Sequence, residues 1–259
     1  MEVDRWDCSR LRLDGQTAVV AGAGALGRAF ALGLAEAGAD MVVADLRLAA
    51  AEEVAAEVES IGRKASALAV DVSKPDECKG MVDVALERLG RLDIMLNGVG
   101  INIRRSSLEV MEQDWDRVMA VNLKGAFFCA QAAARAFVTQ GAGGKIITVA
   151  SHLGIVGMGD RTAYSASKAG VVNMTRSLAY EWAKYRINVN GIAPCYTRTP
   201  INAETLDDPA FREMLVNRIP FRRLGQPEDL VGAAVYLASD ASSFMTGQTL
   251  VIDGGWTTW

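Results

Sequence analysis

Tyr164 and Lys168 stand four positions apart, a spacing that places a phenol and an ammonium on one face of a helix. A phenol has a reference pKa of about 10 and is a poor acid or base at neutral pH. A nearby cation lowers that pKa toward the range useful to a general acid/base catalyst. The pair therefore indicates proton transfer to or from a substrate oxygen.

The same spacing recurs at Tyr180 and Lys184, so spacing alone does not identify the site. Each tyrosine also follows a serine by 13 positions, Ser151 or Ser167. Ser167 and Tyr180 are expected on one continuous helix, about 20 Å apart, where they cannot share a substrate. Tyr164 and Tyr180 also point about 160° apart around that helix. Ser151 instead ends a strand and favours Tyr164; the second pair is interpreted as core or interface packing.

A glycine-rich turn joins the first predicted strand to the first predicted helix. Its residues are Gly22, Ala23, Gly24, Ala25, Leu26 and Gly27. Glycines let the backbone approach a pyrophosphate, and the helix N-terminus supplies amide donors. Asp45 ends the second strand, where a carboxylate accepts the ribose hydroxyls of NAD and repels the 2′-phosphate of NADP. We therefore expect NAD in preference to NADP, although Arg47 nearby could meet a phosphate.

Small or polar residues also follow the next two predicted strands. Asp71 and Val72 end the third strand, and Asn97 and Gly98 end the fourth. Ligands of open α/β sheets lie outside the carboxyl ends of the strands. These four residues are therefore expected to contact the same cofactor as the glycine turn.

Short apolar runs alternate with longer amphipathic segments along the chain. Most of the short runs are apolar throughout, as in strands covered on both faces. The alternation predicts an α/β Rossmann fold, a doubly wound, seven-stranded parallel sheet with helices on both faces. The predicted strands are 17–21, 41–44, 65–70, 92–96, 145–149, 187–191 and 249–252, and the predicted helices lie near 25–38, 48–61, 75–89, 109–140, 162–185 and 227–238.

One long segment, residues 194–227, falls outside this alternation and is punctuated by prolines. A connection of that length in a compact domain is usually a lid or a binding loop. We interpret it as a substrate lid, with a surface insertion as the alternative. No repeat, low-complexity run or linker divides the sequence, so residues 1–259 are expected to form a single dinucleotide-binding catalytic domain.

The composition opposes several other classes of protein. The 259 residues carry a net charge of -4, which provides no basic field for nucleic acid. No run approaches the roughly 20 apolar residues of a membrane span. The four cysteines are widely spaced and His152 is the single histidine, which opposes a disulfide frame or a metal centre. We expect a cytoplasmic protein with a small-molecule substrate, and no metal, nucleic acid or membrane partner.

Together, these motifs resemble the short-chain dehydrogenase/reductase family from Leu11 onward. The resemblance implies hydride transfer between a nicotinamide cofactor and a secondary alcohol or ketone. It rests on ordered pieces: the glycine turn, Asp45, Asp71, the NxxG at Asn97, Asn122 in VNLKG, Ser151, YSASK at Tyr164, IAP at Pro194 and VIDGG near the end.

The resemblance implies a catalytic tetrad. Tyr164 would be the general acid/base, Lys168 would lower its pKa and hold the nicotinamide ribose, and Ser151 would bind the substrate oxygen. Asn122 would hold a water in a proton relay. Pro194 and Thr197 or Thr199 would lie at the carboxamide end of the nicotinamide. The family usually forms tetramers through its two long helices, so a homotetramer or a homodimer is expected.

Three positions depart from the family pattern. The glycine turn is one residue shorter, NNAG is replaced by the NGVG that begins at Asn97, and Cys195 stands where glycine is usual. If the backbone at Cys195 needs a positive φ, a side chain there costs on the order of 1 kcal/mol. All three positions bear on the cofactor cradle and leave the tetrad unchanged.

Several segments resemble sugar-acid dehydrogenases, of the gluconate 5-dehydrogenase and 2-deoxy-D-gluconate 3-dehydrogenase types. These are NxRR, EWAKYRINVN, IPFRRLGQPEDL and the terminal DGGW. Arg104 or Arg105 could bind a substrate carboxylate, for which a guanidinium is suited, or could form a solvated helix start or a subunit contact. His152 is expected to line the pocket. Arg161 and Arg198 are weaker candidates for contact with the substrate.

Three other functions remain open. A 3-oxoacyl-carrier reductase would need NADPH and a basic docking face, which Asp45 and the acidic pI of about 5.2 oppose. A non-catalytic NAD(H) sensor is opposed by the complete tetrad. A lyase or epimerase that uses bound NAD transiently would need a second acid/base group, which the sequence does not indicate.

Overall fold

The computed structural model describes residues 7–199 and 206–258. Its seven strands form one sheet in the order β3-β2-β1-β4-β5-β6-β7, and every neighbouring pair is parallel. The predicted seven-stranded parallel sheet is therefore confirmed. The strands are β1 (Thr17–Ala21), β2 (Asp40–Asp45), β3 (Ala65–Ala69), β4 (Ile94–Asn97), β5 (Gly144–Val149), β6 (Ile187–Pro194) and β7 (Thr249–Ile252).

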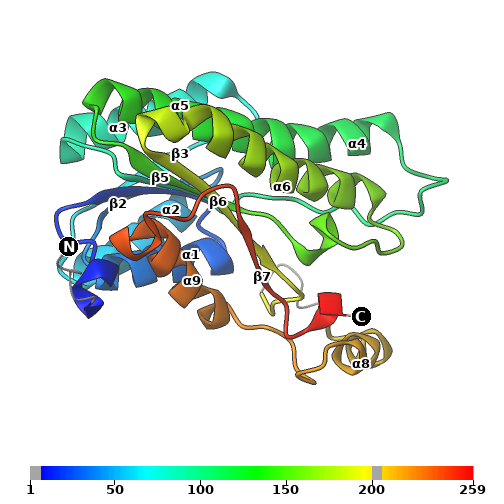
Figure 1. Cartoon of the computed structure of the whole chain (residues 1–259). Helices are drawn as coiled ribbons and strands as arrows, with labels where there is room; N and C mark the ends of the chain where they lie inside the picture. Colours follow the sequence, from blue (N-terminus) through cyan, green and yellow to red (C-terminus); the bar gives the residue numbers. More distant parts are fainter. Residues whose placement is uncertain (1–6, 200–205, 259) are drawn as a thin grey trace.

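Helices cover both faces of this sheet (Figure 1). On one face lie α3 (Pro75–Leu89), α4 (Glu112–Met119), α5 (Gly125–Gln140) and α6 (Thr162–Trp182). On the other face lie α1 (Ala25–Glu36), α2 (Leu48–Ser60) and α9 (Glu228–Ala238). A further helix, α8 (Pro209–Arg218), stands apart from both layers, beside the C-terminus (Figure 1).

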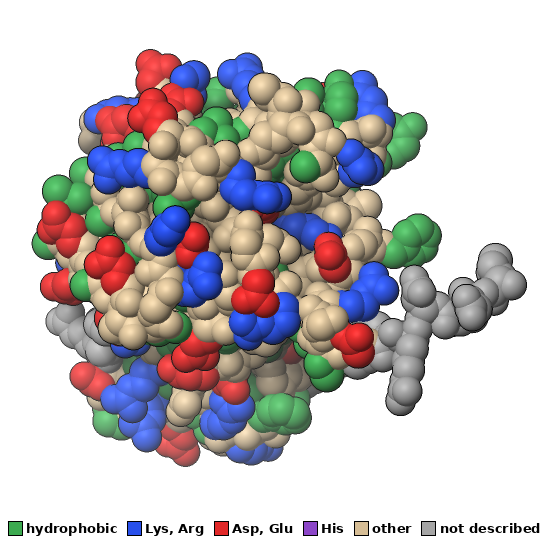
Figure 2. Space-filling model, turned by 90° about the vertical axis from the view of Figure 1, so that its left-hand side faces the viewer, with side chains coloured by type: hydrophobic (Ala, Val, Ile, Leu, Met, Phe, Trp, Pro, Cys, Tyr) green, Lys and Arg blue, Asp and Glu red, His purple; other side chains and the backbone are tan. Residues whose placement is uncertain are grey.

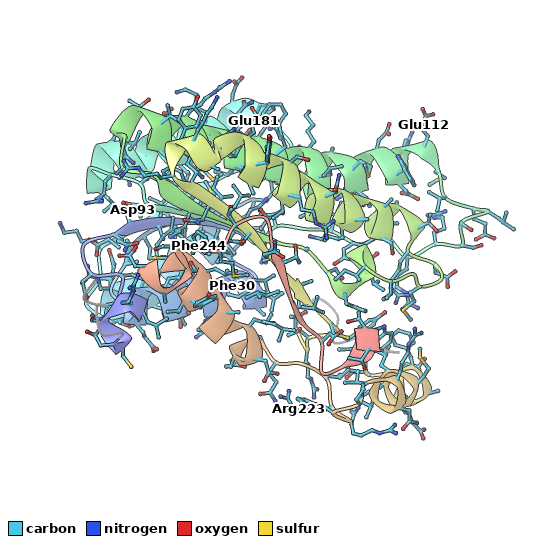
Figure 3. All side chains as sticks on the ribbon, viewed as in Figure 1. Phe30, Asp93, Glu112, Glu181, Arg223 and Phe244 are labelled. Atoms are coloured by element: carbon cyan, nitrogen blue, oxygen red, sulfur yellow. The ribbon has the colours of Figure 1, made fainter. Side chains whose placement is uncertain are left out.

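Two apolar cores result, one on each side of the sheet. Along β1, Val19 and Ala21 pack into the core under α3, α5 and α6, whereas Ala18 and Val20 pack into the core under α1, α2 and α9. Successive side chains of a strand point to opposite faces, so a strand buried on both faces is apolar throughout. Figure 3 shows Phe30 of α1 inside the second layer.

The connection order leaves a crevice beside β1. The chain runs from β1 outward through β2 to β3 and then returns to β4 on the other side of β1. Backbone hydrogen bonds draw the two strand ends together, because Gly22 N donates to Ala44 O at 2.6 Å and Gly98 N donates to Ala21 O at 2.8 Å. Ligands of such sheets bind at this switch point.

Two helical predictions need correction. The predicted helix 109–140 is interrupted by a π-helical turn, Ala120–Lys124, between α4 and α5. The predicted segment 194–227 contains α8, which begins where the Asp208 carboxylate caps the amide of Ala210 and proline occupies the first turn. That cap and proline are a helix start signal in the sequence. Residues 200–205 of the predicted lid lie outside the described residues.

The surface agrees with the modest charge of the sequence. Acidic and basic side chains are interspersed over the face seen in Figure 2. In the described part of the chain, no helix is long and apolar enough to cross a membrane.

Candidate active site

The glycine turn is shaped to bring backbone close to a ligand. Gly22 has φ +98°, a conformation that favours glycine. A Cβ on Gly27 would lie 1.7 Å from the carbonyl oxygen of Gly22, so a side chain there cannot be accommodated. Helix α1 begins at Ala25 without a side-chain cap, which leaves its first amides for a ligand. The shortened turn therefore retains the features of a pyrophosphate cradle.

Asp45 lies at the end of β2, next to this turn. One carboxylate oxygen accepts from Ala23 N at 2.8 Å, and the other accepts from Arg47 N at 3.0 Å. The Arg47 guanidinium is largely exposed, and its Nε lies 3.9 Å from the same carboxylate. Asp45 thus supports the glycine turn as well as presenting a negative charge beside it.

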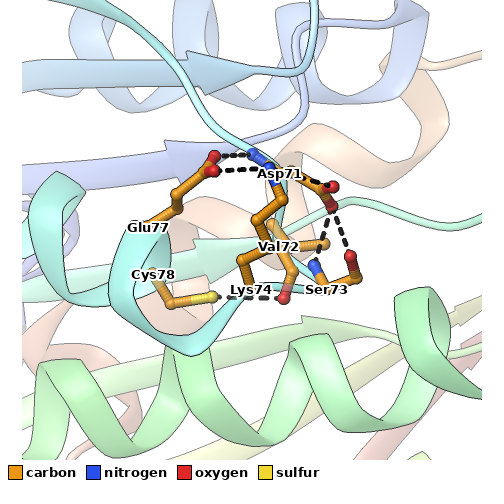
Figure 4. Close-up of polar contacts among 6 residues, drawn as sticks. All are labelled: Asp71, Val72, Ser73, Lys74, Glu77 and Cys78. Atoms are coloured by element: carbon orange, nitrogen blue, oxygen red, sulfur yellow. Dashed lines mark hydrogen bonds and ion pairs between the residues drawn. The ribbon is translucent and has the colours of Figure 1, made fainter.

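Asp71 and Val72 lie in the turn between β3 and α3, in a small polar cluster (Figure 4). The Asp71 carboxylate accepts from both the amide and the hydroxyl of Ser73, at 3.0 and 2.7 Å. These hydrogen bonds lower the pKa of Asp71. The Val72 carbonyl accepts from the thiol of Cys78, whose sulfur lies 3.6 Å from that of Cys129. The cluster fixes the β3–α3 turn with its backbone at the carboxyl edge of the sheet.

A cavity of about 520 Å³ extends from the glycine turn to the C-terminal segments. It brings together thirteen of the predicted site residues: Gly22, Gly24, Leu26, Gly27, Gly98, Arg104, Ser151, His152, Tyr164, Lys168, Pro194, Thr197 and Thr199. Asp45, Asp71, Val72, Asn97 and Asn122 are not among its lining residues. The amide side chain of Asn97 is buried and accepts from Val99 N at 3.0 Å, so it shapes the turn after β4.

Ser151 follows β5 and lines the same cavity as Tyr164. Its hydroxyl caps a short helical turn by accepting from Leu153 N at 3.1 Å. Burial raises the pKa of Tyr164, against the hydroxyl of Ser151 and the charge of Arg161, which lower it. Ser151 and Tyr164 both line the cavity, where one substrate oxygen could contact both hydroxyls.

Lys168 is buried with 4% of its surface exposed. Its ammonium donates to Val149 O at 2.7 Å and lies 5.8 Å from the centre of the Tyr164 ring. Burial lowers the pKa of Lys168 to about 8. The positive charge that lowers the pKa of Tyr164 is that of Arg161. The role of Lys168 in lowering that pKa stays a prediction.

Asn122 occupies the π-helical turn between α4 and α5. Its amide exchanges two hydrogen bonds with the backbone of Ile101, at 2.8 and 2.9 Å, and donates to the Ser167 hydroxyl at 3.0 Å. A Cβ on Gly100 would lie 3.2 Å from the Lys168 ammonium and 3.5 Å from the Asn122 oxygen. The space above Gly100 thus touches both groups, and π-helical turns are frequent at functional sites.

Cys195 follows β6 without the strain considered above. Among the described non-glycine residues, the positive φ values belong to Asp160, Arg186 and Arg222, so Cys195 carries no such cost. Burial raises the pKa of the Cys195 thiol to about 12, which keeps it neutral. Thr197 is buried, and its hydroxyl donates to Cys195 O at 3.1 Å.

Aromatic side chains form the far end of the cavity, which the sequence did not reveal. The His152 ring lies 5.5 Å from that of Tyr196 and 5.2 Å from that of Trp256, and Tyr196 lies 6.2 Å from Phe211 of α8. His152 Nδ1 lies 3.1 Å from Pro194 O, and burial lowers the pKa of His152 to about 4. His152 is therefore neutral, with its ring held in the wall. Tyr196 could have been found because it stands between Pro194 and Thr197, which are both predicted site residues.

The arginine candidates separate clearly. Arg105 pairs with Asp114 at 3.1 Å and does not line the cavity. Arg104 does line it and stacks on the Phe211 ring, 4.8 Å from its centre. Arg161 also lines it and is buried. The substrate end is therefore positively charged.

Tyr180 lies on the outside of α6 and is 90% exposed. The interpretation of this tyrosine as core packing is therefore wrong, whereas interface packing remains open. Figure 3 shows its neighbour Glu181 on the same outer side of α6. As its helical phase predicts, Tyr180 does not line the cavity that Tyr164 lines.

The fold and the cavity together define a nicotinamide-dependent oxidoreductase of the Rossmann type. Residues 20–257 match the adh_short_C2 family, described as enoyl-(acyl carrier protein) reductase. The chain belongs to the short-chain dehydrogenase/reductase family.

Individual relatives are similar over nearly the whole chain. Over 249 residues it is 43% identical to 2-dehydro-3-deoxy-D-gluconate 5-dehydrogenase of Escherichia coli, covering 96% of this chain and 98% of the relative. It is 37% identical to 3-oxoacyl-[acyl-carrier-protein] reductase of Thermotoga maritima, covering 95% and 99%. The solved gluconate 5-dehydrogenase of Burkholderia cenocepacia J2315, in complex with NADP and tartrate, is 38% identical with a TM-score of 0.92, covering 97% and 98%.

Proposed function

We propose that this enzyme interconverts a secondary alcohol and a ketone on a sugar acid, using a nicotinamide cofactor with NAD preferred. The observation that carries the proposal is one cavity lined by Ser151 and Tyr164, by buried Lys168, and by Arg104 and Arg161. Proton transfer at the alcohol and binding of a carboxylate are thereby served in one cavity.

Tyr164 and Ser151 supply the acid/base chemistry. In oxidation, the Tyr164 phenolate accepts the proton of the substrate hydroxyl while the Ser151 hydroxyl donates to the same oxygen. In reduction, Tyr164 returns the proton to the carbonyl oxygen. When bound, the nicotinamide accepts or supplies the hydride.

Lys168 and Asn122 are proposed to connect Tyr164 to solvent. The Lys168 ammonium is fixed on Val149 O, and its pKa of about 8 allows it to exchange a proton near neutral pH. The gap at Gly100 lies against both the Lys168 ammonium and the Asn122 oxygen, which suits a small proton carrier such as water.

The residues present fit a dinucleotide. The close approach of Gly27 to the Gly22 carbonyl and the uncapped amides of α1 form a cradle that a Cβ would fill. The Asp45 carboxylate beside this cradle favours ribose hydroxyls over a 2′-phosphate, and this charge supports NAD. Asp71, Val72 and Asn97 would hold the adenine side through the turns that they shape, and Pro194, Thr197 and Thr199 the nicotinamide side.

The segment 194–227 is proposed to cap the substrate end of a single catalytic domain. Leu206 and Phe211 support this because both line the cavity. Arg104 and His152 would form the wall against which the sugar acid rests.

A homotetramer is proposed through the outer face of α4, α5 and α6. Partly exposed apolar side chains line a groove there, among them Met119, Leu123, Phe127 and Met174. The apolar surface that remains is typical of a contact between subunits. Light scattering coupled to size-exclusion chromatography tests this proposal, and a monomer would refute it.

The decisive experiment is a panel of polyols, aldonates, 2-keto-3-deoxy-aldonates and acyl thioesters, assayed by absorbance with NAD(H) and NADP(H) in parallel. The proposal predicts the highest kcat/KM for a sugar acid with NAD(H). A preference for acyl thioesters with NADPH would support the carrier-reductase alternative instead.

A further inference from the structure

Arg161 is a buried cation with no acidic partner among the described residues. Only 3% of its surface is exposed, and its Nη1 donates to Gly159 O at 3.1 Å. Across residues 7–199 and 206–258 it forms no ion pair with a carboxylate. Buried arginines are rare unless they are paired, because transfer of a charge from water is costly.

The backbone takes a left-handed conformation where it delivers this side chain. Asp160, which immediately precedes Arg161, has φ +60°, a value that aspartate and asparagine adopt more readily than most residues. The carbonyl of Asp160 accepts from Arg105 N at 3.1 Å, and the Arg105 side chain is anchored on Asp114. These contacts tie the loop that carries Arg104 to the loop that carries Arg161.

The surroundings of the guanidinium are aromatic and positive. The rings of Tyr196 and Phe211 each lie 5.8 Å from its central carbon, which offers some cation–π stabilisation. Arg104 stacks on the same Phe211 ring. Burial lowers the pKa of Arg161 and the like charge of Arg104 lowers it further, while Tyr196, Asp160 and Tyr164 act in the opposite direction. Because the like charges of Arg104 and Arg161 are held around the Phe211 ring, an anion bound between them would offset their repulsion.

The position in the chain links this anion site to the chemistry. Arg161 precedes α6 and Tyr164 stands three residues later, so the two side chains are neighbours over one helical turn. Both line the cavity that also contains Ser151 and Arg104. An acid whose carboxylate binds Arg161 would therefore present its carbon chain to the hydroxyls of Ser151 and Tyr164.

We propose that Arg161 is the principal specificity residue of this enzyme and binds the carboxylate of the substrate, with Arg104 closing over the same group from Phe211. The inference rests on the proposed function, which names a sugar acid but not the residue that selects it. It ranks Arg161 above Arg104, because only Arg161 is buried and already desolvated. A planar guanidinium suits bidentate binding of a carboxylate.

The test compares D-gluconate with its neutral amide, D-gluconamide, in wild type and in R161Q and R161K. R212Q is the matched control, because Arg212 is an exposed arginine next to Phe211 on α8. Wild type and R212Q should favour gluconate. In R161Q, KM for gluconate should rise by about 10- to 100-fold, the usual scale of a lost charge-assisted hydrogen bond, and KM for gluconamide should stay within about twofold. R161K should recover part of the preference. NADH binding measured by fluorescence confirms that each variant is folded.

The outcomes separate the two proposals. Equal use of gluconate and gluconamide by wild type would overturn the sugar-acid function and the inference with it. A wild-type preference for gluconate that persists in R161Q would overturn the inference alone. A fall in kcat that is equal for both substrates, with KM unchanged, would also overturn it, because Arg161 would then act through Tyr164 instead of on the substrate.

Discussion

The ammonium of Lys168 donates a 2.7 Å hydrogen bond to the backbone carbonyl of Val149. Val149 is the last residue of β5, two positions before Ser151. The same strand end therefore anchors Lys168 and presents Ser151, while α6 carries both Lys168 and Tyr164. This contact therefore links the two elements that carry Ser151, Tyr164 and Lys168, three of the four tetrad residues.

Lys168→Met should abolish activity but stabilise the fold near pH 7. Burial lowers the pKa of Lys168 from 10.5 to about 8, so the native state binds this proton less readily than the unfolded chain. Below about pH 8 the native state bears the full free-energy cost of burying the charged ammonium. This cost disappears as pH rises to about 10.5. Allowing for the lost hydrogen bond to Val149, the gain should be on the order of 1–2 kcal/mol at pH 7.

Urea unfolding of wild type and Lys168→Met from pH 6 to pH 10 measures this effect. The gain should be constant up to about pH 8 and shrink above it. Lys184→Met, which changes an exposed lysine in the turn that follows α6, should leave stability within about 0.5 kcal/mol. A Lys168→Met variant that is less stable than wild type at pH 7 would contradict the claim that burial of the charged ammonium destabilises the fold.

Asp45 can be tested in two steps because its carboxylate has two functions. Asp45→Asn keeps an oxygen for Ala23 N and removes the charge, so the preference for NAD over NADP should narrow by about tenfold, roughly 1.4 kcal/mol. Asp45→Ala also removes the acceptor and should weaken both cofactors. Titration of NADH and NADPH by fluorescence provides the measurement. An unchanged ratio of dissociation constants in both variants would remove Asp45 from the ribose site.

Gly100→Ala should slow proton transfer without weakening cofactor binding. The added methyl group would lie 3.2 Å from the Lys168 ammonium and fill the gap that it shares with Asn122. We expect kcat to fall by about one order of magnitude, within the usual contribution of general acid–base catalysis. Gly80→Ala, on α3 with nothing within 4 Å of the new Cβ, is the control. Wild-type kcat in Gly100→Ala would argue against a relay at this point.

The sheet, and the placement of Ser151 and Tyr164 in one cavity, could be predicted because each depends on local pattern. Strands that are apolar throughout, such as β1, predict a parallel sheet, and topology then brings the carboxyl ends of those strands together. Asp45 and Ser151 stand at such ends. Helical phase separated Tyr164 from Tyr180 for the same reason, since 3.6 residues per turn fixes direction along one helix.

The substrate end depends on long-range contacts and could not be predicted in the same way. Phe211 reaches the cavity because α8 folds back beside the C-terminal segment, and no sequence period encodes that placement. Arg104 and Arg105 are adjacent in sequence, yet Asp114 captures only Arg105. The π-helical turn at Asn122 also escaped prediction, because a single wider turn scarcely alters the hydrophobic pattern of α4 and α5.

Tyr164→Phe tests most directly whether Tyr164 is the acid/base group. The measurement is kcat/KM for the best sugar acid of the panel in wild type, Tyr164→Phe and Tyr180→Phe, with NADH binding followed by fluorescence in each. We predict that Tyr164→Phe loses about 10²- to 10⁴-fold in kcat/KM while still binding NADH. Tyr180→Phe should match wild type, because its ring is 90% exposed on the outside of α6. Wild-type kcat/KM in Tyr164→Phe, or an equal loss of kcat/KM in Tyr180→Phe, would contradict the assignment of Tyr164 as the acid/base group.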